Sequence, residues 1–126
     1  MVKLILFVHK NAQAPGDRLI QSIKANFKDI PIDVCTDVKG LEKTLPPNWR
    51  GVSLQRIFIL LMDCDERLEQ VFPFVDLFER ERILIVLPDS NQASIKKTSR
   101  FYPRYTTQIS NEYRDVIDVI SKMIQN

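Results

Sequence analysis

Four short apolar runs and a fifth, more polar run, each followed by a helix-length stretch, constrain this fold more than any other feature of the sequence. Continuous apolar runs of four to six residues, bounded by polar residues, are typical of strands that are buried on both faces. A fifth run is more polar and suits the edge of a sheet. The expected strands are Leu4–Val8, Ile32–Cys35, Ile57–Met62, Ile83–Leu87 and, at the edge, Tyr105–Ile109.

The stretches between these runs predict five amphipathic helices. In the last of them, apolar side chains recur at helical spacing, from Tyr113 to Ile124. The proline at position 73 is expected to bend the third helix or to start a new turn. The segment Pro46–Ser53, which carries the only tryptophan, predicts a loop. The expected helices are Gly16–Lys28, Val38–Leu45, one starting near Asp65, one between Ser90 and Tyr102, and one capped by Ser110 or Asn111.

Strands that alternate with helices through short connections imply a parallel sheet with right-handed crossovers and helices on both faces. We therefore expect an α/β three-layer sandwich with five parallel strands in the order 2-1-3-4-5. The chain has 126 residues, which fits one domain. No internal repeat or interdomain linker divides it, so a single domain over residues 1–126 is the expectation.

Composition removes several classes of function. Two cysteines and one histidine are too few for a disulfide scaffold or a four-ligand Cys/His zinc site. Three glycines do not make a glycine-rich phosphate loop. A net charge of +2 gives no general affinity for nucleic acid. The opening apolar run is too short to span a bilayer and lacks a cleavage site, so we expect a cytoplasmic protein without a membrane partner.

Any ligand site should lie beyond the carboxyl ends of the strands, as is usual in parallel sheets. His9 and Lys10 follow the first predicted strand, and Asp63 and Asp65 follow the third. Lys10 could pair with one of these carboxylates and so neutralise the cluster without a ligand. Cys64 lies between two acids, which disfavour its thiolate. With no nucleophile elbow or catalytic triad order, we expect no enzyme activity, no catalytic residue, no metal and no cofactor.

Five βα units in this length, ending in the segment Tyr105–Glu112 and an amphipathic last helix, resemble the receiver domain of two-component response regulators. The resemblance covers the whole chain and implies a flavodoxin-like, receiver-like fold. It also implies a site in which an aspartate at the end of the third strand accepts a phosphoryl group. Two acids after the first strand would hold Mg²⁺, while a Thr or Ser after the fourth strand and a Lys after the fifth would bind the phosphoryl group.

This sequence departs from that pattern at nearly every position. His9 and Lys10 replace the acid pair, and Asp63 alone matches the phosphorylated aspartate. Pro88 stands at the Thr/Ser position and Gln108 at the Lys position. The resemblance therefore implies a degenerate receiver, or pseudo-receiver, that serves as a phosphorylation-independent signalling or protein-interaction module. Two alternatives stay open: a small enzyme or ligand-binding domain that uses the cleft of His9, Lys10 and Asp63, and an atypical receiver phosphorylated on Asp63.

The resemblance also implies where a partner would bind, because receivers use the surface of the fourth helix, fifth strand and fifth helix for partners and for dimerisation. A protein partner or a second copy is therefore expected there. The competing interpretation is a solvated basic face with its aromatic residues turned inward. A second apolar stripe, Phe74, Leu77 and Phe78, is a further candidate surface. The partner-binding candidates are Lys96, Lys97, Arg100, Phe101, Tyr102, Tyr105, Val119 and Met123.

Overall fold

The computed structural model describes residues 2–45, 55–78, 81–88, 92–109 and 113–125. Its strands are β1 (Val2–Phe7), β2 (Ile32–Cys35), β3 (Gln55–Leu61), β4 (Arg82–Leu87) and β5 (Tyr105–Gln108). Its α-helices are α1 (Gln13–Asn26), α2 (Val38–Thr44), α3 (Asp65–Val71), α4 (Gln92–Thr98) and α5 (Arg114–Gln125). Three 3₁₀-helices accompany them: η1 (Lys10–Ala12), η2 (Phe72–Phe78) and η3 (Ser99–Phe101).

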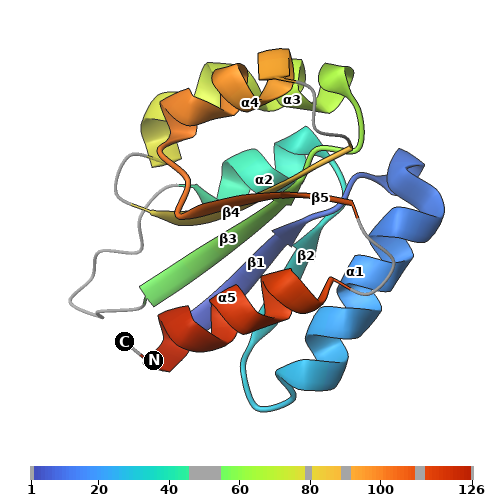
Figure 1. The fold of residues 1–126 in the computed structure, drawn as a ribbon, viewed down its shortest axis with the longest axis vertical. Coiled ribbons are helices and arrows are strands. Elements are labelled where there is room, and N and C mark those ends of the chain that lie inside the picture. Colours follow the sequence, from blue (N-terminus) through green and yellow to red (C-terminus); the bar gives the residue numbers. More distant parts are fainter. Residues whose placement is uncertain (1, 46–54, 79–80, 89–91, 110–112, 126) are drawn as a thin grey trace.

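The five strands form one parallel sheet in the order β2-β1-β3-β4-β5 (Figure 1). In the centre of the sheet, Leu4 of β1 lies opposite Ile32 of β2 and Ile57 of β3. The predicted fold class and strand order are therefore confirmed. The described helices include none long and apolar enough to cross a membrane.

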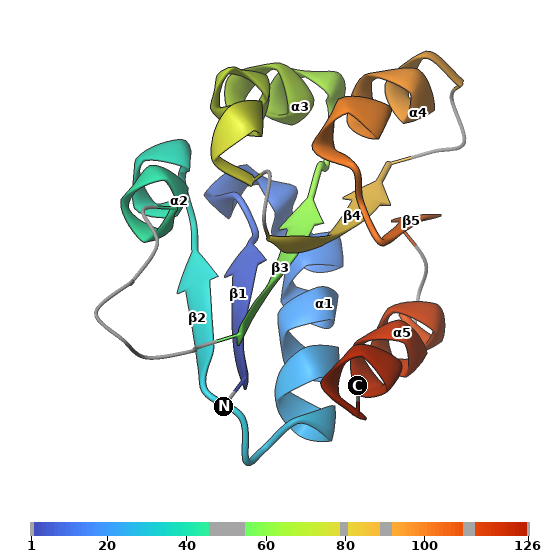
Figure 2. The ribbon, with the colours of Figure 1, turned by 90° about the vertical axis from the view of Figure 1, so that its left-hand side faces the viewer.

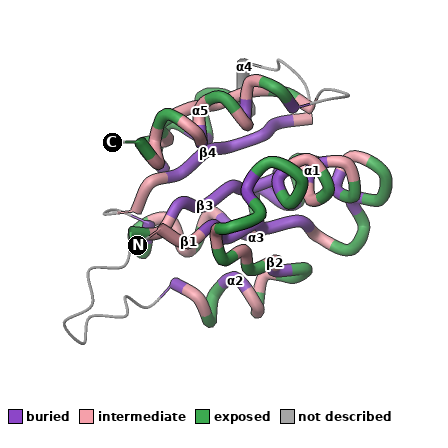
Figure 3. The backbone as a smooth tube through the Cα atoms, turned by 90° about the horizontal axis from the view of Figure 1, so that it is seen from below, coloured by how far each residue is buried: buried purple, intermediate pink, exposed green. Residues whose placement is uncertain are grey.

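The sheet separates two apolar cores. Helices α1 and α5 cover one face, and α2, α3 and α4 cover the other (Figure 2). Alternate side chains of each strand enter opposite cores, as the pleat requires: Leu4 and Leu6 pack on the α1 and α5 side, whereas Ile5 and Phe7 pack on the other. Figure 3 shows the consequence: the central strands β1, β3 and β4 are mostly buried, whereas the helices are exposed on their outer faces. This two-sided burial explains the continuous apolar runs of β1, β3 and β4, whereas the predicted run at β2 contains the exposed Asp33 and is buried only at Cys35.

Two local features refine the predicted elements. The α-helical geometry of α3 ends at Val71, and η2 begins one residue before Pro73, whose missing N–H disrupts the α-helical bonding pattern. Tyr113, expected within the last helix, instead precedes α5 with a left-handed φ of 52°. It is fully buried, and its hydroxyl donates to the Pro15 carbonyl at 2.9 Å. The predicted loop with Trp49 and the predicted caps Ser110 and Asn111 lie outside the described residues.

The apolar stripe of Phe74, Leu77 and Phe78 is divided by η2. Phe78 is buried and packs edge-on against Phe58 and Phe101. Phe74 is half-buried against the same core. Only Leu77 is substantially exposed, at 52%. Most of this stripe is thus a continuation of the core.

Candidate functional site

The ends of β1, β2 and β3 bring together several of the polar residues singled out in the sequence. His9 follows β1, Asp37 follows β2 and Asp63 follows β3, and these three strands are neighbours in the sheet. The charges of Asp63, Asp37 and Lys10 all act on the His9 imidazole. These residues therefore lie at the ends of three adjacent strands, at one edge of the sheet.

Asp63 has an ion-pair partner that the sequence analysis did not single out. The Nε atom of Arg67 lies 3.1 Å from Oδ1 of Asp63, one helical turn further along the chain. The contact is an ion pair without the alignment of a hydrogen bond. Both side chains are largely shielded, with 6% of Arg67 and 13% of Asp63 exposed. Asp63 precedes α3 by two residues and Arg67 lies in the first turn of that helix, so the pair joins the end of β3 to α3 and is not a pair on one helix face.

Further contacts fix the Arg67 guanidinium. Its Nη1 atom donates to Oε1 of Gln70 at 3.2 Å and lies 3.9 Å from the Glu66 carboxylate. Lys10, which was considered as a partner for the acidic residues, is instead exposed at the start of η1. Its backbone N–H donates to the Thr36 carbonyl at 3.1 Å. The cation paired with Asp63 thus comes from α3.

His9 has a structural role in the turn after β1. Its Nδ1 atom accepts from the Asn11 backbone N–H at 3.1 Å, so the side chain caps η1. Partial burial and the nearby Arg67 charge lower the pKa of His9 below its usual 6.5. Both effects favour the neutral ring, because a ring protonated at Nδ1 could no longer accept this bond.

These residues do not fit the Mg²⁺ that a receiver site would hold. Mg²⁺ takes oxygen ligands, yet an imidazole and an exposed ammonium follow β1, and Asp63 already has a guanidinium beside it. Over the part of the chain that the structure describes, no three His, Cys, Asp or Glu side chains gather as a metal would require. Pro88 follows β4 and offers no hydroxyl, and exposed Gln108 ends β5 with an uncharged amide.

Two of the basic partner-binding candidates, Lys97 on α4 and Arg100 on η3, lie beside Phe72 of η2. Lys97 lines a cavity together with Phe72, and the Arg100 guanidinium lies 5.1 Å from the centre of the Phe72 ring. Phe101 is buried, 2% exposed, against Phe72 and Phe78. Phe101 is therefore a core residue and is not available as a surface anchor.

Tyr102 is the exposed aromatic residue of this region. Its side chain is 82% exposed, and its backbone has a left-handed φ of 49° as it closes η3. A bulky residue in this conformation is uncommon and strained. Lys96 on α4 is exposed as well.

The remaining candidates join β5 to α5. The hydroxyl of Tyr105 donates to Oδ2 of Asp115 at 3.2 Å, and the Thr107 hydroxyl bonds to the same atom. Burial and the Asp115 charge raise the pKa of Tyr105. Val119 and Met123 are half-buried and pack on the core beneath α1 and α5. These residues therefore have structural contacts, whatever else their outer surfaces do.

Comparison with known proteins identifies the architecture. No protein-family model matches the sequence, and no curated protein is significantly similar to it. The chain superimposes on a response regulator from Thermotoga maritima with a TM-score of 0.64, over 100% of both chains, at 8% sequence identity. At this identity the likeness shows the fold alone. The chain therefore has the flavodoxin-like, receiver-like fold of that response regulator.

Proposed function

We propose that this chain is a signalling module that binds a protein partner through a receiver-like fold, without phosphorylation of an aspartate. The observation that carries the proposal is the ion pair between Asp63 and Arg67. Asp63 stands where the resemblance to receivers places the phosphoryl acceptor. Its carboxylate is shielded and already has a cation of the chain itself beside it, at 3.1 Å.

The surroundings of Asp63 support the same proposal. Phosphoryl transfer relies almost entirely on positioning and on stabilisation of the developing charge. Here the neutral His9 ring occupies the end of β1, and Gln108 at the end of β5 supplies no positive charge. Arg67 brings a positive charge, but its Nε atom already lies against Oδ1 of the carboxylate that would have to attack. These features support a role in which Asp63 is not phosphorylated.

The proposed working surface is the face of α4, β5 and α5. Tyr102 offers a large exposed ring there, and Lys96 of α4 is exposed as well. Aromatic residues often supply most of the binding energy of an interface, and a neighbouring charge directs the approach of an acidic partner. The occupant is a protein partner or a second copy of the chain.

Treatment with acetyl phosphate and Mg²⁺, followed by intact mass measurement, tests the proposal against an atypical receiver. We expect wild-type protein and Asp63→Asn to remain unmodified under conditions that phosphorylate a conventional receiver run in parallel. A product heavier by one phosphoryl group in the wild type, and absent from Asp63→Asn, would favour the atypical receiver and overturn the proposal.

A further inference from the structure

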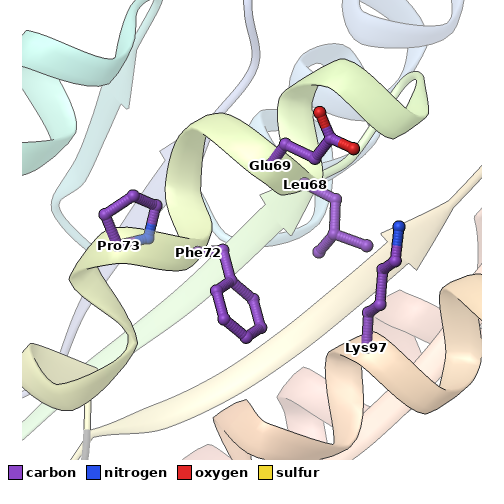
Figure 4. A pocket seen from close by; sticks show the side chains of 5 residues that line it. All are labelled: Leu68, Glu69, Phe72, Pro73 and Lys97. Carbon is purple, nitrogen blue, oxygen red and sulfur yellow. The ribbon is translucent and has the colours of Figure 1, made fainter.

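A groove between α3 and α4 was not anticipated from the sequence. The cavity has a volume of about 310 Å³ and is lined by Leu68, Glu69, Phe72, Pro73 and Lys97. Figure 4 shows Leu68 and Phe72 extending from α3 and η2 toward α4, from which Lys97 projects. Most of the lining is apolar side chain. It lies on the opposite side of α4 from the face of α4, β5 and α5, so it is a separate surface.

The two walls of the groove carry opposite charges. Glu69 is exposed on the α3 wall and Lys97 on the α4 wall. Neither has an ion-pair partner within the described ranges. Glu66, three residues before Glu69 on α3, has 71% of its side chain exposed and lies 3.9 Å from Arg67, while the Arg100 guanidinium lies above the Phe72 ring. An apolar strip therefore runs between an acidic edge and a basic edge.

We propose that this groove binds an amphipathic helix of a partner protein, with an apolar ridge flanked by basic residues on one side and acidic residues on the other. The basic flank would face Glu69 and Glu66, and the acidic flank would face Lys97 and Arg100. The pattern sets the direction of the helix, because a helix turned end for end would bring like charges together.

The shape of the groove favours a helix over the other occupants. Helices α3 and α4 lie side by side (Figure 2), and the side-chain ridge of a third helix fits the furrow between two such helices. The volume is at the lower end of the range for small-molecule sites, about 300–1,000 Å³. It accommodates one or two anchoring side chains at i and i+3 or i+4. A second copy would set groove against groove and leave the space unfilled.

Three fluorescein-labelled helical peptides test this proposal on the full chain. All carry the same leucine ridge; their flanks are one Lys and one Glu side, both Lys, or both Glu. Fluorescence anisotropy at low salt is expected to rank the mixed peptide first for the wild type. Lys97→Glu should shift the preference to the all-Lys peptide, and Glu69→Lys to the all-Glu peptide. Each shift should be up to about fivefold, the size expected for one exposed ion pair.

Lys24→Glu on α1 is the matched control, because Lys24 is exposed on the opposite face of the sheet. It should leave the order of the peptides unchanged. Amide chemical shifts should move at Glu69, Phe72 and Lys97 when the mixed peptide binds. The proposal is overturned if neither charge reversal changes the order, if the shifts lie on α4, β5 and α5 instead, or if only a small zwitterion such as free leucine binds. None of these outcomes depends on whether Asp63 is phosphorylated.

Discussion

Charged side chains at the strand ends have partners within the chain, whereas those on the outer side of α3 and α4 face solvent. At the strand ends, polar groups are satisfied within the chain: Asp63 pairs with Arg67, and His9 caps η1. Asp37 likewise caps α2, its Oδ1 accepting from the Gly40 N–H at 2.7 Å. On the outer side, Glu69 and Lys97 face solvent and have no ion-pair partner among the described residues.

This difference indicates which region is available for recognition. A shielded ion pair is costly to break, because removing one member leaves a charge with little solvent around it. Exposed charges contribute little to stability and can change partners freely. Our proposals therefore assign structure to the strand ends and binding to the helical surfaces. Variants of the two regions should behave differently.

The largest effect is expected from removing the cation beside Asp63. Arg67→Met leaves the shielded carboxylate unpaired and should lower the free energy of unfolding by about 2–4 kcal/mol. Urea unfolding measures this change. Adding Asp63→Asn should recover part of the loss, since no lone charge then remains. Lys10→Met, at an exposed position, is the matched control and should change stability by less than about 0.5 kcal/mol. Equal losses of unfolding free energy in Arg67→Met and Lys10→Met would contradict the proposed difference between the strand ends and the helical surfaces.

A second effect should come from the close packing of α1 beneath the end of β1. A Cβ atom added at Gly16 would lie 2.5 Å from Cγ1 of Val8 and 3.1 Å from Cβ of Ala12. Gly16→Ala should therefore destabilise the protein by about 1–3 kcal/mol, the usual cost of overpacking. At Gly40 the nearest atom is the Asp37 carboxylate oxygen at 3.1 Å. There the gain in helix propensity, about 1 kcal/mol, should offset most of the crowding. Thermal denaturation of both variants compares them.

Much of the fold could be predicted because the main signal is two-sided burial. The runs that predicted β1, β3 and β4 lie within one or two residues of these strands at their ends. The prediction Ile32–Cys35 coincides with β2, although this strand contains the exposed Asp33 and is not buried on both faces. The candidate site was harder to predict, because sequence order does not say which cation reaches a carboxylate. Lys10 follows the neighbouring strand and Arg67 follows Asp63 by four residues, so either cation could have reached Asp63. The helix that starts at Asp65 brings Arg67 to the carboxylate.

The arrangement of surface side chains was the hardest feature to predict from the sequence. Helical spacing grouped Lys96, Lys97 and Arg100 on one basic face, but it did not indicate their neighbours. The packing of Arg100 on Phe72 and the place of Lys97 in the groove depend on how α4 lies beside η2. The burial of Phe101 has the same cause, since the short α4 continues as η3 and turns this ring into the core. Such relations arise only when the helices pack.

A smaller, pH-dependent effect should come from His9, which is half-buried. Its folded-state pKa lies below 6.5, so the unfolded chain binds the proton more readily. This contribution to stability is fully present above pH 6.5 and is lost as the pH falls through the folded-state pKa. His9→Asn keeps a capping side chain without a titrating ring and should flatten the pH dependence of the urea midpoint between pH 5 and 7. An unchanged slope would show that His9 is not its source.

The smallest change in stability, with a large change in binding, is expected at Tyr102. A bulky residue with left-handed φ is strained, and glycine relieves that strain. Tyr102→Gly should therefore be as stable as the wild type or more stable, with a free energy of unfolding higher by less than about 1 kcal/mol. Tyr102→Ala keeps the strained backbone and should not gain stability. Both variants remove the exposed ring, so both should lose any partner or self-association that uses the face of α4, β5 and α5. Sedimentation analysis and affinity capture measure that loss, with Lys24→Glu as a surface control.

If Tyr102→Gly is more stable than the wild type and loses its partner, the strain at this position is tolerated because the ring is needed for binding. If both variants bind as the wild type does, the exposed ring is not an anchor and this face is the wrong surface. If Tyr102→Gly instead unfolds at a lower temperature than Tyr102→Ala, the tyrosine position contributes to folding. Residue 102 at the end of η3 would then have a structural role and could not be assigned to the recognition surface alone.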